Sequence, residues 1–433
     1  MQCIYCFFKD KFQNELKMKD RQFRFELELK EYKKKFIKSL GEVCSCSECI
    51  NKHKFSKNVL AQFDEVSTDV KSKKEYIAEV FDQIINVYML YISKNHISAF
   101  IGLENFLKKY SNNYTTINTI QMCKPMFRVR PLGSYDKKNI CEYFHIPFTK
   151  RYNVGNQRYS MTGIPMSYMA ETLQIALDEV EKGIEEVNIA LFVPRFSCFY
   201  QKGMYDVSNT ISGALDTIIV ESTQNSSISY DNAIYTFSKK NMDKIIADYI
   251  LYQILQFPTN SNTKGVFIQE YVLPQMMMEM IQNQDGYVGM QYQTSKFREY
   301  PNEGEVHKVP NLNYCFFIPY IEENDYNKNL LNDFFFVIYN EDDADINDEK
   351  LQQRIDSCHK HCKEAQSKLY LVDEYRHYIT QVEMYIKKTT LINLTYDKSK
   401  VYKVERALFY KFLGLLDEII SNPETVSYTH LRA

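Results

Sequence analysis

Glycine and proline are scarce in this 433-residue sequence, with 13 and 11 residues respectively. Their scarcity excludes collagen-like and mucin-like chains, and a composition that is 45% hydrophobic and 25% charged excludes a disordered one. The sequence also lacks any run of 18 apolar residues, and no apolar segment follows a basic start at the N-terminus. We therefore expect neither a membrane span nor a secretion signal, and the predicted location is the cytoplasm.

The sequence also has little net charge, which is -2 at pH 7. A value so close to zero provides no general attraction to nucleic acid or to membranes. Residues 1–60 carry 14 Lys and Arg against 8 Asp and Glu, so this part is +6 and the remainder is -8. Only the N-terminal part could favour a polyanion, and neither nucleic acid nor a membrane is an expected partner.

Hydrophobic periodicity predicts an α+β protein. Between Phe23 and Leu29, apolar residues alternate with charged ones, which indicates a strand. From Ile77 to Ile92, apolar residues recur every three or four positions, as on an amphipathic helix that faces a core. The other predicted strands are Val187 to Val193 and Tyr314 to Tyr320, and the other predicted helices are Leu173 to Lys182, Asp243 to Gln256, Phe267 to Gln282, Leu351 to Lys387 and Val404 to Ile420.

A chain of this length is expected to form two or three folded domains. We predict a cysteine module (1–57), a helical bundle (58–115), a central α+β domain (120–325), a C-terminal helical extension (326–425) and a non-native tail (426–433). The tail, VSYTHLRA, resembles a translated sequencing adapter and takes no part in the prediction of the fold. Residues 341–349 carry six acids and are predicted to be a solvated loop.

The cysteines form two clusters and are odd in number, at eleven. In a chain this long, that pattern favours reduced thiols and metal ligands over disulfides. Cys3-x-x-Cys6 and Cys46-x-x-Cys49 offer two chelating pairs, by which four thiolates can enclose Zn²⁺ tetrahedrally. Cys44 and His53 are alternative ligands. Such a zinc site would stabilise the fold of the N-terminal part rather than catalyse a reaction.

The second cluster, Cys358-His-Lys-His-Cys362, falls within a predicted helix. Its two cysteines are one turn apart on one face, and no further ligand pair is evident nearby. We therefore interpret them as thiols that face the core, and we assign them no metal.

An ordered series of motifs occupies the middle of the chain. His145-Ile-Pro-Phe precedes Arg151, and Arg158-Tyr-Ser, Ser-Tyr168-Met-Ala and Ala-Leu-Asp-Glu179 follow in turn. Much later comes a stretch that ends in Thr294-Ser295. Over residues 125–320 this series resembles the RES domain, a family named for its Arg, Glu and Ser. The N-terminal cysteine pairs and helical bundle likewise resemble the HEPN-type domain that accompanies some RES domains.

The resemblance implies a fold and an activity for residues 120–325. RES domains resemble ADP-ribosyltransferases in fold, so the expected reaction is cleavage of NAD between nicotinamide and ribose. ADP-ribose would then pass to a protein, to water or to phosphate. RES proteins often act as toxins held by an antitoxin of the Xre type, so such an antitoxin and an ADP-ribose acceptor are expected partners, and the additional domains suggest a sensor in phage defence.

Physical chemistry suggests roles for the two arginines and the tyrosine. The planar fork of Arg158 can bind the pyrophosphate of NAD with two charge-assisted hydrogen bonds, and Arg151 is a second candidate ligand. Tyr168 offers a flat face for the nicotinamide ring.

The remaining candidates are a carboxylate and a hydroxyl. Loss of nicotinamide leaves an oxocarbenium-like sugar, and Glu179 can hold the ribose hydroxyls and offset that charge. The family's serine could be Thr294 or Ser295, and we choose Ser295 as the catalytic residue, with Thr294 as a ligand of the cofactor. Either hydroxyl can donate a hydrogen bond to a phosphate or to the nicotinamide amide.

Two other functions compete with this prediction. An RNase of the HEPN type would need an Arg and a His a few residues apart, a spacing that Arg354 and His359 fit, although this pair lies outside the N-terminal bundle. A non-catalytic scaffold of zinc and helices would be favoured by loss of Arg158 or Glu179, and both residues are present.

Overall fold

A computed structural model gives the three-dimensional structure of the chain. The residues that it describes are 2–19, 21–49, 55–111, 116–117, 119–133, 139–208, 211–212, 215, 218, 242–260, 265–294, 312–340, 346–365, 372–392 and 399–421. His53, Ser295, most of the acidic loop 341–349 and the tail 426–433 lie outside this set. Among the described residues, no helix has both the length and the apolarity that crossing a membrane requires.

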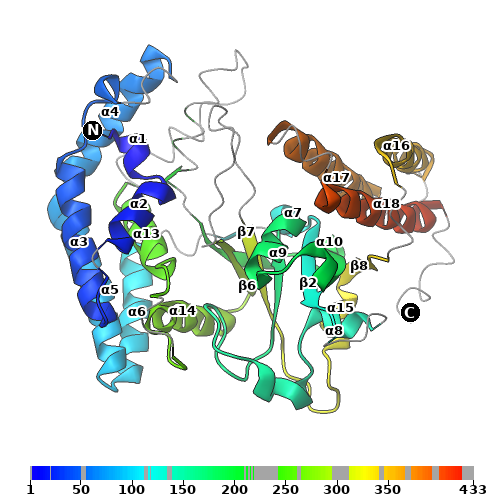
Figure 1. Cartoon of the computed structure of the whole chain (residues 1–433), viewed down its shortest axis with the longest axis horizontal. Coiled ribbons are helices and arrows are strands. Elements are labelled where there is room, and N and C mark those ends of the chain that lie inside the picture. The colour runs from blue at the N-terminus through cyan, green and yellow to red at the C-terminus, as the bar shows by residue number, and fades with distance from the viewer. Residues whose placement is uncertain are drawn as a thin grey trace.

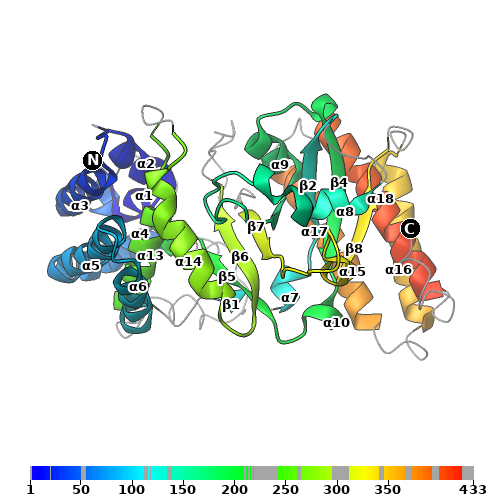
Figure 2. The same cartoon turned by 90° about the horizontal axis from the view of Figure 1, so that it is seen from below.

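The centre of the molecule is one mixed sheet with helices on both of its faces (Figures 1 and 2), so the predicted α+β class is confirmed. The described strands follow the order β1-β5-β6-β7-β3-β2-β4-β8, and β5 and β6 form the one parallel pair among them. Their bounds are β1 (Thr116–Ile117), β2 (Met126–Pro131), β3 (Met166–Ala170), β4 (Val187–Pro194), β5 (Gly203–Val207), β6 (Tyr287–Gln293), β7 (Leu312–Phe317) and β8 (Phe334–Ile338). The predicted strands near 187–193 and 314–320 correspond to β4 and β7.

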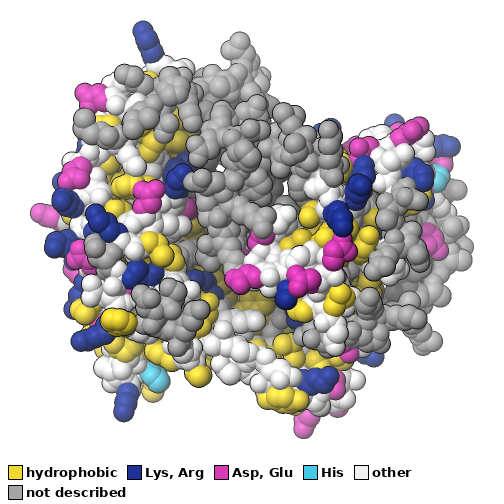
Figure 3. All heavy atoms as spheres, in the orientation of Figure 1, with side chains coloured by type: hydrophobic (Ala, Val, Ile, Leu, Met, Phe, Trp, Pro, Cys, Tyr) yellow, Lys and Arg dark blue, Asp and Glu magenta, His cyan; other side chains and the backbone are white. Residues whose placement is uncertain are grey.

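The N-terminal helical unit, which we define as residues 2–111, lies beside one end of the sheet (Figure 1). It consists of α1 (Ile4–Phe7), α2 (Asp10–Met18), α3 (Phe25–Gly41), η1 (Cys46–Glu48), α4 (Lys57–Ser72), α5 (Lys74–Ile92) and α6 (His96–Tyr110). The helix predicted from Ile77 to Ile92 lies within α5. On the face shown in Figure 3, basic and acidic side chains are interspersed over this unit, so its positive charge is not gathered into one patch there.

The strand predicted between Phe23 and Leu29 is wrong, because the residues from Phe25 onward form the first turns of α3. The alternation covers only a few residues. A helical spacing begins at Phe25 and continues through Leu29, Tyr32, Phe36 and Leu40, all of which are buried. The longer repeat defines the face that packs against the core, which explains why the helix forms.

Two helices from the middle of the chain complete the core of the N-terminal unit. Both α13 (Met242–Leu255) and α14 (Val272–Gln282) correspond to helices predicted from the sequence. Their buried residues share one hydrophobic cluster with α1 to α6 and with the β5-β6-β7 end of the sheet. The α13 helix is buried on most sides, as its position between the unit and the sheet requires.

The C-terminal part begins with α15 (Lys328–Asn332) and β8, which complete the sheet before three helices follow. These are α16 (Asp348–Ala365), α17 (Val372–Ile392) and α18 (Lys400–Ser421). The single helix predicted from Leu351 to Lys387 is therefore two helices, α16 and α17, which pack against each other. The apolar periodicity is alike in both, so it could not reveal the break between them.

The two faces of the sheet are covered differently. One face carries α7 (Thr119–Met122), α8 (Ile140–Phe144), α10 (Phe196–Phe199) and α15. The other face is covered by two groups of helices. At the β5-β6-β7 end, the N-terminal unit packs on it together with α13 and α14. At the β2-β4-β8 end, α9 (Leu173–Val180) packs on it together with α16, α17 and α18. Strands β3 and β7 lie where these two covers meet, and the candidate site lies there.

Candidate functional site

The floor of the candidate site is the face of the sheet between its two covers. Tyr168 on β3 is paired with Cys315 on β7, which is paired in turn with Met290 on β6. Two residues along the strands, Asn313 is paired with Tyr292. Directly paired residues point to the same face, and residues two apart on one strand do so as well, so these side chains share the face that carries the site.

Glu179 reaches this floor from the last turn of α9. That helix is capped at its N-terminus by Thr172, whose hydroxyl accepts a hydrogen bond from the Ile175 amide, and it ends before Glu181, which is in the left-handed conformation. The Glu179 Oε1 atom accepts hydrogen bonds from Thr294 Oγ1 at 2.6 Å and from Asn313 Nδ2 at 2.7 Å. The structure thus joins two residues proposed from the sequence, Glu179 and Thr294.

Asn313 is the residue of this group that sequence reasoning missed. It is 3% exposed and lies in a strand with the sequence LNYCFF, so it is a polar residue in an apolar, buried run. A buried amide must find a hydrogen-bonding partner, and here that partner is the carboxylate of Glu179. The signal that could have identified it is its place in the sequence, as a polar residue directly before the predicted strand Tyr314 to Tyr320.

Arg158 is held by backbone carbonyls at the end of α13. Its Nη1 atom donates to the Leu255 oxygen at 2.9 Å and to the Phe257 oxygen at 3.0 Å, and its guanidinium lies over the Tyr271 ring at 5.0 Å. Within the described part of the chain, its Nε and Nη2 atoms have no hydrogen-bonding partner. The guanidinium is therefore anchored at one nitrogen, with donors left for an anion.

Tyr292 connects the two charged residues. Its ring lies 4.5 Å from that of Tyr159, which directly follows Arg158. Burial raises the pKa of Tyr292 well above its ordinary value, the negative charge of Glu179 raises it further, and the positive charge of Arg158 lowers it. Glu179 and Arg158 thus act electrostatically, with opposite sign, on the same phenol.

Tyr168 belongs to the same floor, and its side chain is more enclosed than the predicted role suggested. Its hydroxyl is buried beside Ser160 and Cys315, without a hydrogen bond of good geometry to the described residues. Burial raises its pKa well above the ordinary value, so the phenol stays neutral. The residue as a whole is partly exposed.

Arg151 lies apart from this group. It is exposed, its Nε atom donates to the Phe148 oxygen at 3.2 Å, and its guanidinium lies 4.9 Å from the centre of the Tyr320 ring. Among the described residues, it makes no contact with Arg158 or Glu179. Gln275 instead supports the Arg158 loop, because its Nε2 atom donates to the Gln157 oxygen at 2.8 Å.

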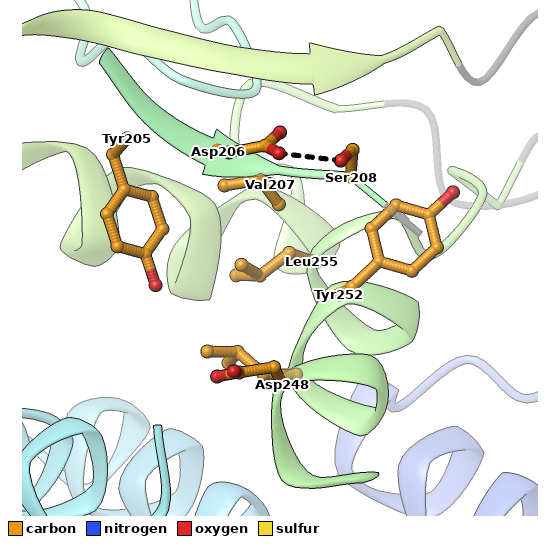
Figure 4. A pocket seen from close by; sticks show the side chains of 8 residues that line it. Tyr205, Asp206, Val207, Ser208, Asp248, Tyr252 and Leu255 are labelled. Atoms are coloured by element: carbon orange, nitrogen blue, oxygen red, sulfur yellow. Dashed lines mark hydrogen bonds between the residues drawn. The ribbon is translucent and has the colours of Figure 1, made fainter. Parts of the chain in front are cut away.

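A small pocket of about 20 Å³ lies next to the Arg158 anchor (Figure 4). Its lining is Tyr205, Asp206, Val207, Ser208, Asp248, Leu251, Tyr252 and Leu255. Leu255 also supplies one of the carbonyls that bind Arg158. Figure 4 shows Asp206 on β5 and Asp248 on α13 on opposite sides of the pocket. Two carboxylates disfavour a phosphate, so we place no pyrophosphate there.

Three of the four predicted thiol ligands converge. The sulfurs of Cys3, Cys6 and Cys49 all lie within 4.8 Å of one another, with 3.9 Å from Cys3 to Cys6 and 3.7 Å from Cys6 to Cys49. Cys46 is fully buried and lies near enough to Cys3 that its thiol raises the pKa of Cys3. The α1 helix carries the first pair and η1 the second, so folding of the N-terminal unit assembles a cluster that could bind a metal.

The histidine and arginine proposed for an RNase have separate partners. His359 lies 3.4 Å from Glu383 on α17, whereas Arg354 donates to the Tyr410 hydroxyl at 2.8 Å and pairs with Asp417 on α18 at 3.5 Å. Asp417 is also bound by His361, at 2.6 Å, and by the Ser357 hydroxyl, at 3.2 Å. These contacts join α16 to its two neighbours, and Cys358 and Cys362 are buried between them, as the sequence indicated.

We compared the chain with protein-family models, with curated proteins and with solved structures, and none of the three comparisons found a match. The resemblance to RES and HEPN domains therefore rests on the motifs described above.

Proposed function

We propose that the protein is an NAD-consuming enzyme that cleaves the bond between nicotinamide and ribose, with Glu179 as its central carboxylate. The observation that carries this proposal is the pair of hydrogen bonds from Thr294 and Asn313 to Glu179. They fix the position of a carboxylate in the group of residues that carries the RES resemblance. A fixed negative charge is what a developing oxocarbenium ion requires.

In the proposed reaction, the bond between the nicotinamide nitrogen and C1 of the ribose breaks, and its electron pair leaves with nicotinamide. The acceptor, which is water, phosphate or a protein side chain, adds to C1 and gives up a proton. Glu179 offsets the positive charge on the ribose between these events. The free donors of Arg158 bind the pyrophosphate, because a guanidinium can form parallel hydrogen bonds with phosphate oxygens.

We further propose that the cluster of Cys3, Cys6 and Cys49 binds zinc, with Cys46 as its fourth ligand. Thiolates are preferred ligands of Zn²⁺, and four of them close its coordination shell to water. The role is structural, since Cys3, Cys46 and Cys49 are buried and the cluster ties α1 to η1. An Xre-type antitoxin and a protein acceptor of ADP-ribose remain proposed partners of the enzyme.

The decisive experiment incubates the purified protein with NAD and separates nicotinamide, ADP-ribose and ADP-ribose phosphate. We expect release of nicotinamide, and the second product identifies the acceptor. Parallel incubations with phosphate and with a protein extract separate the three acceptors. Intact NAD under all three conditions would contradict the proposal.

A further inference from the structure

The segment Gln253–Pro258, at the end of α13, is shared by two parts of the molecule. On one side, the carbonyls of Leu255 and Phe257 hold the guanidinium of Arg158. On the other side, the same segment is bound by side chains of the N-terminal helical unit, which lies more than two hundred residues away in sequence. Any displacement of this segment moves both acceptors of Arg158 together.

Lys17 and Asp10 on α2 hold the first residue of the segment. Gln253 is 1% exposed, and its Oε1 atom accepts a hydrogen bond from Lys17 Nζ at 2.6 Å. Its Nε2 atom donates to Asp10 Oδ1 at 3.0 Å. A buried amide that is bonded at both ends has a single favourable orientation, so α2 determines where the end of α13 lies.

Arg21 holds the other end of the segment. Its Nη1 atom donates to the Pro258 oxygen at 3.0 Å, and the same guanidinium pairs with Glu28 at 2.8 Å and with Glu270 at 3.0 Å. The three side chains are only 9%, 4% and 4% exposed, so solvent screens these ion pairs weakly. Because its position is fixed by two carboxylates, Arg21 is a rigid support for the backbone.

The ring of Phe257 fills the space between these supports. It lies 5.1 Å from the Phe25 ring and 5.7 Å from the Tyr32 ring, both on α3. The Lys17 ammonium nitrogen and the Arg21 guanidinium lie 5.7 Å and 5.4 Å from its centre. The residue whose carbonyl binds Arg158 is thus packed on its other side against the N-terminal unit.

We propose that Lys17 and Arg21 are positioning residues of the active site, which set the guanidinium of Arg158 through the Gln253–Pro258 segment. This inference rests on the proposed function, because it assigns to Arg158 the binding of the pyrophosphate. It makes the N-terminal unit a required part of the NAD site. Neither residue is a catalytic residue, since each acts through backbone that Arg158 contacts.

The test compares Lys17→Met with Lys33→Met, a matched control in which the lysine pairs with Asp82 on the outside of the unit. Lys17→Met should raise the KM for NAD about tenfold and leave kcat within about twofold, because the pyrophosphate is bound less well in both ground and transition states. Lys33→Met should change neither constant. Arg21→Gln should act as Lys17→Met does, and the conservative Arg21→Lys should restore part of the affinity.

The combination with Arg158→Ala distinguishes positioning from a general loss of stability. If Lys17 acts through Arg158, adding Lys17→Met to Arg158→Ala should change KM no further. Two effects that multiply would overturn the proposal, as would an unchanged KM in Lys17→Met. Variants that unfold are identified by circular dichroism, and the double-variant comparison is then made with Arg21→Lys.

Binding of inorganic pyrophosphate, measured by calorimetry, separates this inference from the proposed reaction. If the wild type binds pyrophosphate but leaves NAD intact, the proposed function fails, and weaker pyrophosphate binding in Lys17→Met still supports positioning. If the wild type binds neither pyrophosphate nor NAD, the position of the Arg158 guanidinium is followed instead by the nuclear magnetic resonance signal of its Nε–H group. An identical signal in wild type and Lys17→Met would overturn the proposal.

Discussion

At the scale of single residues, the partners of Glu179 matter more than its place in the sequence. A glutamate near the end of a helix is ordinarily solvated, whereas this one accepts hydrogen bonds from two neutral donors, Asn313 on β7 and Thr294 directly after β6. Both donors hold one oxygen of the carboxylate in place. The residue is therefore suited to offset a positive charge.

Glu179→Gln should lower the kcat for NAD cleavage about 10²- to 10³-fold and change the KM little. Glutamine keeps the size of the side chain but removes the charge that the transition state requires. The matched control is Asp178→Asn on the same helix, where the carboxylate accepts from Gln174 at 2.9 Å, and it should keep near-normal kcat. Equal losses in the two variants would argue against a specific role for Glu179.

Lys17 is the second residue whose surroundings have a measurable consequence. Burial lowers its pKa to about 7, with Asp10 opposing that shift and Arg158 adding to it. Between pH 7 and its ordinary pKa, the folded protein holds a neutral amine while the unfolded chain binds a proton. The unfolded state therefore binds more protons, and this residue makes stability rise as the pH increases through that window.

Lys17→Met should remove the unfavourable contribution that the buried lysine makes to the free energy of unfolding, and with it the pH dependence of that contribution. We expect the variant to be more stable than the wild type at pH 7, by an amount on the order of a few kcal/mol before any loss of packing. The advantage should shrink at pH 9 and vanish near pH 10.5. Thermal unfolding of both proteins at the three pH values measures this difference in stability. A difference in Tm that is independent of pH would contradict the lowered pKa of Lys17.

At the scale of elements, strand β6 shows how tightly the floor of the site is built. Gly289 lies between β5 and β7, and a Cβ atom at this position would overlap the Cys315 carbonyl oxygen and come within 2.6 Å of Met204 Cε. The neighbour is backbone on one side, so it cannot move aside as a flexible side chain would. Glycine is required here for the close approach of the strands.

Gly289→Ala should therefore destabilise the protein by about 1–3 kcal/mol, through displacement of β6 from β7. Gly265→Ala is the control, because an added Cβ at that position meets no atom of the described residues within 4 Å. Comparison of their Tm values with that of the wild type tests the prediction. Since β6 leads to Thr294, the Gly289 variant should also lose NAD cleavage, whereas the Gly265 variant should retain it.

At the scale of the whole molecule, the helices at the N-terminus are part of the same core as the sheet. Buried residues of α1 to α6, α13, α14 and strands β5 to β7 form one hydrophobic cluster. The thiol cluster lies at the start of this unit, and Phe8, which directly follows α1, packs against Tyr249 of α13 with ring centres 4.9 Å apart. Loss of a metal there should therefore affect more than the first fifty residues.

Removal of zinc should lower the stability of the whole protein. We expect about one zinc per chain by elemental analysis, a lower Tm after treatment with a strong chelator, and recovery on addition of Zn²⁺. Cys49→Ser should abolish zinc binding, whereas Cys198→Ser, which changes a partly exposed cysteine far along the chain, should retain it. A protein purified without zinc and with a Tm that is insensitive to chelation would disprove the site.

Periodicity and spacing in the sequence determined much of the local structure. The helices α5, α13 and α14 and the strands β4 and β7 were predictable, because the side chains that define them are neighbours in the chain. The two Cys-x-x-Cys motifs were visible for the same reason. At the start of α3, a short alternation typical of a strand overlaps a longer helical repeat, and the residues form a helix.

Only the tertiary structure decided which polar groups meet. Thr294 and Asn313 lie 115 and 134 residues from Glu179, and Arg158 finds its acceptors 97 and 99 residues away. The RES resemblance brought Arg158, Glu179 and Thr294 into one proposal, but it did not indicate Asn313 or the support that Lys17 and Arg21 give. Contacts of this kind depend on how the helices pack on the sheet, and no local pattern in the sequence records that packing.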